Sequence, residues 1–208
     1  MKLIFLHGLG QNEQSWQAVV EQLPQYSCEM FNCFAQVGDA LVTRESLTQS
    51  LQDFLEQQEE PFVLVGLSLG SLLALSLPIQ KLPNLRGMVL ASAQYQLKDS
   101  FMFKVQYAIF SLLPQKVFNF GLTKAQTLSL LKSNLSLDLT EQLAQIHVPI
   151  HFICGAKDAF NLKASRALSQ LLPQATYAEI PNGKHELNRQ TPGAFAHEIQ
   201  NFMEKLAF

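Results

Sequence analysis

The sequence predicts an α/β fold, a doubly wound, mostly parallel sheet of about six strands with helices on both faces. Two observations predict it. Short apolar runs alternate with longer segments in which apolar residues recur every three or four positions, as in chains that alternate strands and helices. The apolar runs are nearly continuous, which is typical of parallel strands buried on both faces. With 208 residues and no internal repeat, the chain is expected to form a single domain, 1–208.

The composition favours a soluble, globular protein. The formal net charge is −2 with scattered charges, which argues against nucleic acid as a partner. Leu3–Leu6 is too short for a signal peptide, and no run reaches the roughly 18 apolar residues of a membrane-spanning helix. The three cysteines lie in apolar runs without metal-ligand spacing, so buried, reduced thiols and a cytoplasmic location are predicted: Cys28, Cys33 and Cys154.

Two strands and two helices are predicted before residue 61. The strands are Lys2–Leu6 and a segment within 27–34, and residues 36–41, with Gly38 and Asp39, are expected to form a loop. Asn12 is of a type that caps helices. Apolar positions at helical spacing mark the two helices: Trp16, Val19, Val20 and Leu23 for the first, and Leu47, Leu51, Phe54 and Leu55 for the second.

A strand, a sharp turn and a helix are predicted around Ser68. The run 62–65 is apolar and partly β-branched, and from Leu69 the residues suit a helix that stops at or before Pro78. Between them lies the Gly-x-Ser-x-Gly spacing of a nucleophile elbow, in which a strained turn raises the serine hydroxyl above the end of the strand. The glycines, Gly66 and Gly70, let strand and helix approach closely. The next strand is predicted at 86–93.

Residues 95–140 contain no clear strand pattern and are predicted to form an inserted helical lid. Aromatic residues recur in it: Phe101, Phe103, Tyr107, Phe110, Phe118 and Phe120. Its charged residues are mostly basic: Lys98, Lys104, Lys116, Lys124 and Lys132 against Asp99 and Asp138. The pattern favours aromatic residues that pack the lid onto the body while lysines face solvent. Two other interpretations are that a basic lid over an apolar pocket selects an acyl chain with an anionic head group, or that the lid contacts a membrane.

The last third of the chain predicts two strands and two helices. The strands are 148–154, which runs into Gly155-Ala156-Lys157-Asp158, and 176–180, which leads to Gly183-Lys184-His185. Leu162, Leu168, Leu171 and Leu172 mark a helix between them that Pro173 stops. Pro192 opens the final helix. The core face of that helix is predicted at Phe195, Ile199, Phe202, Met203 and Leu206.

Three residues are candidates for nucleophilic catalysis. A serine hydroxyl needs a base to take its proton, and that base needs an acid to hold its tautomer. Functional groups on a parallel sheet gather at the carboxyl ends of strands. Asp158 and His185 follow such ends, and the order Ser68, Asp158, His185 is expected for a triad on this kind of sheet. Glu186 and Asp138 are alternative acids. The other histidines are poorer candidates for the base: His7, His147, His151 and His197.

Two backbone amides are candidates for the oxyanion hole. One is the N–H of Leu69, which opens the helix after the serine, and the other is the N–H of Leu9 in the His-Gly-Leu-Gly loop after the first strand. The loop lacks the lysine of a P-loop and the longer Gly-x-Gly-x-x-Gly pattern of dinucleotide-binding proteins. No cofactor and no metal are therefore predicted.

The chain resembles the α/β-hydrolase superfamily over residues 1–208. The loop at 7–10, the elbow at 66–70, and the motifs at 155–158 and 183–185 carry the resemblance. In similar enzymes the serine, aspartate and histidine at these positions form the triad, and the residue after His-Gly supplies an oxyanion amide. The resemblance begins at the family's third strand, so the usual first hairpin is expected to be missing.

The resemblance implies a lid-bearing serine hydrolase, similar to esterases and thioesterases, that cleaves a small carboxylic ester or thioester through an acyl-enzyme. The expected partner is a small acyl substrate, with no nucleic acid and no membrane insertion. Fold and triad do not fix the chemistry. A lyase or a C–C bond hydrolase that uses the same triad is therefore the first alternative, and a noncatalytic ligand-binding protein of this fold is the second.

Overall fold

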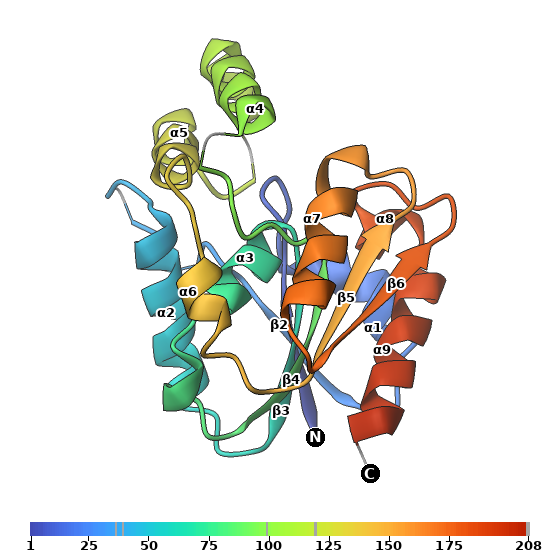
Figure 1. Cartoon of the computed structure of the whole chain (residues 1–208). Coiled ribbons are helices and arrows are strands. Elements are labelled where there is room, and N and C mark those ends of the chain that lie inside the picture. Colours follow the sequence, from blue (N-terminus) through green and yellow to red (C-terminus); the bar gives the residue numbers. More distant parts are fainter. Residues whose placement is uncertain (36, 39, 99, 119, 207–208) are drawn as a thin grey trace.

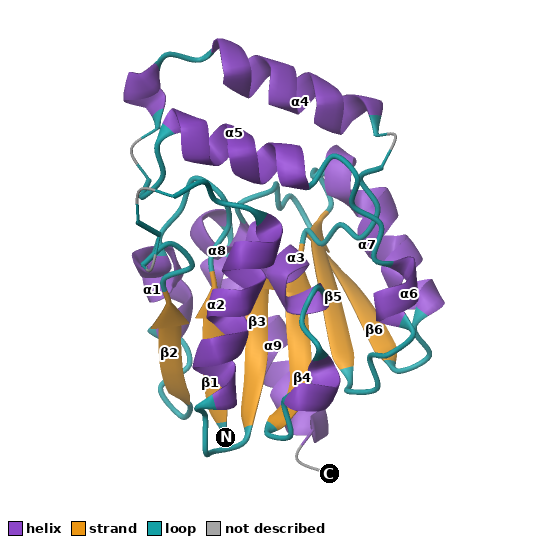
Figure 2. Ribbon diagram, turned by 90° about the vertical axis from the view of Figure 1, so that its left-hand side faces the viewer, coloured by secondary structure: helices purple, strands orange, loops and turns teal. Residues whose placement is uncertain are grey.

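The computed structural model describes residues 1–206 except 36, 39, 99 and 119, and its centre is one six-stranded sheet. All pairings are parallel, and the strand order is β2-β1-β3-β4-β5-β6 (Figure 2). The strands are β1 (Lys2–Leu6), β2 (Ser27–Phe31), β3 (Phe62–Leu67), β4 (Leu85–Ala91), β5 (Ile150–Gly155) and β6 (Ala175–Ile180). The predicted fold class, a mostly parallel sheet of about six strands with helices on both faces, is confirmed.

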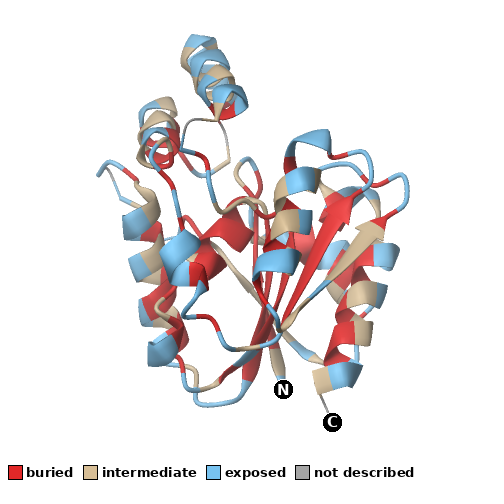
Figure 3. Cartoon of the chain, viewed as in Figure 1, coloured by how far each residue is buried: buried red, intermediate tan, exposed pale blue. Residues whose placement is uncertain are grey.

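Helices cover both faces of the sheet, because alternate residues of each strand point to opposite sides. On one face, Ile4 and Leu6 of β1 join a core with α2 (Arg44–Glu56), α3 (Leu69–Leu75), α6 (Thr140–Leu143) and α7 (Ala159–Leu171). On the other, Leu3 and Phe5 pack in a second core with α1 (Gln17–Val20), α8 (Leu187–Gln190) and α9 (Pro192–Leu206). Figure 3 shows the buried strands between these layers.

Two predicted elements are shorter in the structure than in the sequence pattern. The first helix is a 3₁₀ turn at Glu13–Trp16 followed by the single turn of α1, and Leu23 lies outside it. A proline disfavours helical geometry in the residue before it, so the helix ends before Leu23, which precedes Pro24. Leu23 is still buried, but it reaches the core from the turn that follows the helix. The strand predicted at 86–93 ends at Ala91, because Ser92 has a positive φ of 50°. Asp39 of the predicted loop lies outside the described residues.

The inserted segment, residues 95–140, contains the predicted helices. They are α4 (Phe101–Leu112), the 3₁₀ turn η3 (Gln115–Val117) and α5 (Lys124–Ser133), and they lie beyond the carboxyl ends of the strands (Figure 2). Two backbone hydrogen bonds join the two ends of the inserted segment. The N–H of Leu97 donates to the carbonyl of Leu137, and the N–H of Leu139 donates to the carbonyl of Tyr95, both at 2.9 Å. Asp99 lies outside the described residues. The inserted segment thus leaves the sheet and returns to it at neighbouring points.

Burial corrects two predictions about side chains. Phe103 and Phe118 of the inserted segment are buried, but Phe101 is 74% exposed, so it does not pack the segment onto the body. Cys33 and Cys154 are buried as predicted, whereas Cys28, on the edge strand β2, is only half-buried. All three cysteines are unpaired. Within the described residues, no helix has both the length and the apolar character needed to cross a membrane.

Candidate active site

Ser68 occupies a strained turn between β3 and α3. Its φ is 53° and its ψ is −108°, a conformation that costs a non-glycine residue about 1–3 kcal/mol. The flanking glycines make the turn possible. A Cβ on Gly66 would lie 2.7 Å from the backbone nitrogen of Ser71, and one on Gly70 would lie 2.6 Å from the carbonyl carbon of Leu6. Strand, turn and helix are therefore packed backbone against backbone, and the serine side chain points away from them.

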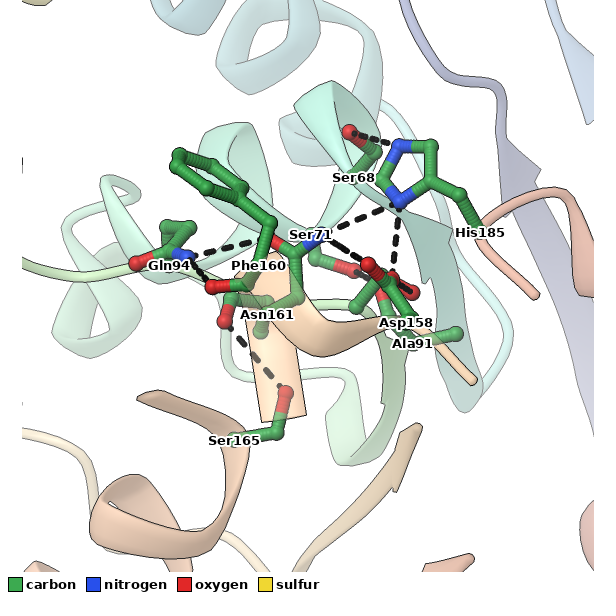
Figure 4. A network of polar contacts seen from close by, with 11 residues as sticks. Ser68, Ser71, Ala91, Gln94, Asp158, Phe160, Asn161, Ser165 and His185 are labelled. Atoms are coloured by element: carbon green, nitrogen blue, oxygen red, sulfur yellow. Dashed lines mark hydrogen bonds and ion pairs between the residues drawn. The ribbon is translucent and has the colours of Figure 1, made fainter. Parts of the chain in front are cut away.

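The three predicted catalytic side chains meet in one chain of contacts (Figure 4). Oγ of Ser68 lies 3.0 Å from Nε2 of His185, and Nδ1 of His185 lies 2.9 Å from Oδ2 of Asp158. The Asp158 side chain is 5% exposed, whereas the His185 side chain is 45% exposed. The ring is therefore held by a buried carboxylate on one side and reaches solvent on the other.

The loops after β5 and β6 bring Asp158 and His185 together. A Cβ on Gly155 would lie 2.5 Å from the carbonyl carbon of Gly183, so the two loops touch through their backbones. The N–H of Lys157 donates to the carbonyl of Gly183 at 2.8 Å. These glycines belong to the Gly-Ala-Lys-Asp and Gly-Lys-His motifs, and their role is close approach of the two loops.

Two further side chains hold Asp158. Ser92 donates its hydroxyl to Oδ2 at 2.8 Å, and Asn161 donates Nδ2 to both carboxylate oxygens at 2.9 Å. Burial raises the pKa of Asp158, but the hydrogen bonds from His185 and Ser92 outweigh it, and the net shift of the pKa is downward. Gln94 in turn donates to Oδ1 of Asn161 at 3.0 Å. Asp158 is thus kept ionised and fixed in position.

Sequence reasoning missed these supporting residues, although signals for them exist. Ser92 follows the carboxyl end of β4, the place where Asp158 and His185 were sought on the neighbouring strands. Asn161 lies three residues after Asp158, on the first turn of α7. Gln94 has no comparable signal, since it lies in an irregular segment whose course depends on tertiary packing.

The loop after β1 lies beside the elbow. A Cβ on Gly8 would be 3.6 Å from Cβ of Ser68, and Leu9 and Leu69 line the same cavity as Ser68. Leu69 is the first residue of α3, so its N–H is among the helix amides that have no carbonyl partner within the helix. The loop thus has the position that the predicted oxyanion amide of Leu9 requires.

Buried polar contacts fix this loop to its surroundings. His7 is fully buried, its Nε2 accepts the N–H of Cys33 at 3.1 Å, and burial lowers the pKa of the ring. Gln11 and Asn188 form a buried pair of amides with contacts of 3.1 and 3.2 Å. Since Asn188 lies on α8, three residues after His185, this pair ties the loop of Leu9 to the segment of the histidine.

The alternative acids lie elsewhere. The carboxylate of Asp138 accepts hydrogen bonds from Thr140 and Gln96 at the neck of the inserted segment, and Glu186 lies 3.6 Å from Arg189. Neither has a contact with the ring of His185 among the described interactions.

A cavity of about 420 Å³ opens over Ser68 and His185. The floor comes from the strand ends and α3, and the walls come from α4, α5 and the start of α7. Its described lining is mostly apolar and contains neither lysine nor arginine. No group of three or more potential metal ligands occurs in the described part of the chain. The site therefore offers a nucleophile, a base, an acid and an apolar space for a substrate.

Comparisons with known proteins agree with the fold. A Haemophilus influenzae protein provisionally named 2-succinyl-6-hydroxy-2,4-cyclohexadiene-1-carboxylate synthase is 26% identical over 99% of this chain and 98% of its own. The pimeloyl-[acyl-carrier protein] methyl ester esterase of Vibrio vulnificus is 25% identical over 98% and 94%. The crystal structure of a lipase-esterase related protein from Clostridium acetobutylicum has the same fold, with a TM-score of 0.80 at 21% identity over 97% and 93%. Residues 3–198 match the alpha/beta hydrolase family, and the chain belongs to that family.

Proposed function

We propose that this protein is a serine hydrolase that cleaves a small, uncharged carboxylic ester or thioester. The observation that carries the proposal is the unbroken chain of contacts from Ser68 through His185 to Asp158, at 3.0 and 2.9 Å. A hydroxyl on a strained turn, within hydrogen-bond reach of an imidazole that a buried carboxylate orients, is the arrangement of an activated nucleophile.

In the proposed reaction, His185 Nε2 takes the proton of Ser68 as Oγ attacks the substrate carbonyl. The resulting oxyanion is bound by the N–H groups of Leu9 and Leu69. Collapse of the tetrahedral intermediate breaks the bond to the alcohol or thiol, which leaves with the proton from His185. A water molecule then attacks the acyl-Ser68 ester, with His185 again as base, and releases the carboxylic acid. Asp158 stabilises the imidazolium in both steps.

The inserted segment acts as the lid in this proposal. Met102, Phe103 and Gln106 of α4, with Leu130 and Leu131 of α5, line the cavity above the serine. These mostly apolar side chains would surround the acyl group and exclude water from the acyl-enzyme bond. An anionic head group, if the substrate carries one, would lie outside the cavity, because the cavity's described lining offers no cation to it.

The same observation weighs against the first alternative, a lyase or C–C hydrolase with the same triad. The name of the Haemophilus influenzae relative includes a carboxylate. A carboxylate in this cavity would lose its hydration and be repelled by the anionic Asp158, and the described lining contains no lysine or arginine to compensate for this cost. A noncatalytic binding protein is disfavoured for another reason, since it would gain nothing from the strain at Ser68.

Labelling by a fluorophosphonate probe tests the proposal. We expect the wild type to be labelled and to hydrolyse p-nitrophenyl butyrate, Ser68→Ala to lose both, and the control Ser111→Ala, a half-buried serine on α4 outside the described cavity lining, to keep both. Asp158→Asn should lower kcat by roughly three to four orders of magnitude while the protein stays folded. A folded wild type that takes no label would overturn the mechanism. Faster turnover of the succinate monoester of p-nitrophenol than of the butyrate would instead overturn the preference for uncharged substrates.

A further inference from the structure

One side of α4 is apolar and open to solvent. Phe101 is 74% exposed, Met102 56%, Ile109 53% and Leu112 85%. At 100° per residue these four positions fall within about one quarter of the helix circumference. We call them the α4 outer face. Exposed apolar side chains are ordinary when single, but a contiguous group marks a contact surface.

The opposite side of α4 already anchors the helix. Phe103 is buried, Tyr107 and Phe110 pack against the core, and the ring of Phe110 lies 6.1 Å from that of Phe118. The outer face is therefore free of any role in holding the helix to the protein. Figures 1 and 3 show α4 as the outermost element, at the end of the molecule opposite both termini.

The segment that carries the outer face is basic. Residues 100–137 contain four lysines, Lys104, Lys116, Lys124 and Lys132, and no aspartate or glutamate, although the whole chain has a net charge of −2. Lys116 is exposed on η3, next to the exposed Val117. The segment thus combines an apolar stripe with positive charge, the combination by which helices bind in the plane of anionic membranes.

We infer that the α4 outer face docks on an anionic lipid bilayer, with its apolar side chains among the acyl chains and exposed lysines of the same segment, such as Lys116, at the lipid phosphates. A second copy of this chain fits less well, because a symmetric contact through α4 would bring two lysine-rich segments together. An acidic protein fits less well, because the four side chains of the outer face offer no hydrogen-bonding group to a partner.

This contact places the cavity at the membrane. Met102 belongs to the outer face and also lines the cavity, so it lies at the cavity rim. A docked α4 would therefore open the cavity beside the lipid surface, where hydrophobic esters collect. The docking itself does not depend on the proposed hydrolysis, and binding alone can test it.

Cosedimentation with vesicles tests the docking. We expect the wild type to bind vesicles of phosphatidylcholine with one third phosphatidylglycerol, to bind pure phosphatidylcholine much less, and to be weakened by high salt. The double variant Phe101→Ser, Leu112→Ser should bind the anionic vesicles about tenfold less or weaker still. Leu171→Ser is the matched control, because Leu171 is 51% exposed on α7, and it should bind as the wild type does.

Two further measurements test whether the variants are folded and whether the protein self-associates. Far-UV circular dichroism and thermal unfolding must match between the double variant and the wild type, since both changed side chains are exposed. Sedimentation equilibrium without lipid reports self-association. A wild type that stays in the supernatant with anionic vesicles overturns the inference, as does equal loss of binding in Leu171→Ser. A dimer that the double variant dissociates, without lipid binding, would assign the outer face to a second copy and also overturn it.

Discussion

Gly70→Ala tests whether the elbow depends on backbone contact between α3 and β1. A Cβ at this position would lie 2.6 Å from the carbonyl carbon of Leu6, nearer still to the carbonyl oxygen, and 2.8 Å from the Cβ of Leu6. Real Cβ atoms essentially never come within 3.0 Å of a heavy atom outside their own residue and its two chain neighbours. The nearest atoms are backbone atoms of a central strand, so no flexible side chain can give way, and helix and strand must separate by about 1 Å.

The expected cost follows from that separation. Forced repacking of a close-packed interior typically costs 1–3 kcal/mol, and a clash with backbone belongs at the upper end, about 3 kcal/mol. Activity should fall as well, because Leu6 leads into the loop of Leu9 and Gly70 follows Ser68 by two residues. A displacement of about 1 Å between nucleophile and oxyanion amides is enough for a roughly hundredfold loss in kcat/KM.

Urea unfolding and ester hydrolysis measure the two effects. Gly38→Ala is the control, since a Cβ on Gly38 meets nothing within 4 Å, and it should leave both unchanged or raise stability slightly. Activities are compared at a temperature where both variants are folded. If Gly70→Ala keeps the wild-type midpoint and rate, the close approach of α3 to β1 is not what holds Ser68 in place.

Three further variants or treatments probe the polar groups. Ser92→Ala removes a hydrogen-bond donor to Asp158, which should lower kcat/KM about tenfold or more. Because the carboxylate then becomes more basic, the acid limb of the pH profile of kcat/KM should move to higher pH. An acid limb that does not move argues against this role of Ser92. Burial lowers the pKa of His151 despite its hydrogen bond to Glu198, so the unfolded chain binds the proton more readily and stability should fall as pH drops below about 6.5. Urea midpoints on either side of that pH should differ less in His151→Gln, and an equal difference contradicts the assignment. Burial raises the pKa of Cys33 to about 12 and of Cys154 to about 11, so iodoacetamide at neutral pH should leave both unmodified in the native protein; rapid alkylation of either contradicts its burial.

The sequence predicted those parts of the fold that local pattern controls. All six strands begin or end within a few residues of their predicted bounds. For the four inner strands, β1, β3, β4 and β5, the signal was a nearly continuous apolar run, as expected where both faces of a strand are buried. The edge strands β2 and β6 are only partly buried and have more mixed sequences. Ser68 was found from the Gly-x-Ser-x-Gly spacing. Asp158 and His185, which a chain of contacts joins to Ser68, were found by the rule that functional side chains follow the carboxyl ends of parallel strands. Pattern and topology were sufficient there.

Prediction failed where a residue's environment comes from distant parts of the chain. Phe101 looks like the other aromatic residues of its segment, and only the orientation of α4 decides that it faces solvent. Asn161 looks like any polar residue of a first helical turn, and its importance comes from an Asp158 that the fold buries beside it. Apolar spacing shows that a helix has two sides, but the tertiary structure decides which side is covered.

The distribution of charge connects the active site to the outer surface of the inserted segment. Inside the cavity the described lining offers one carboxylate, Asp158, and no lysine or arginine, which is the basis for proposing an uncharged reacting group there. Outside it, residues 100–137 carry only positive charges. A substrate with an anionic part would therefore be held by its charge at the outer surface while its ester enters the apolar cavity beside Met102. An anionic bilayer that holds neutral hydrophobic esters meets the same two requirements without any charge on the ester itself. Attachment of the protein and selection of its substrate would then depend on two adjoining sides of the same helix, α4, which meet at Met102.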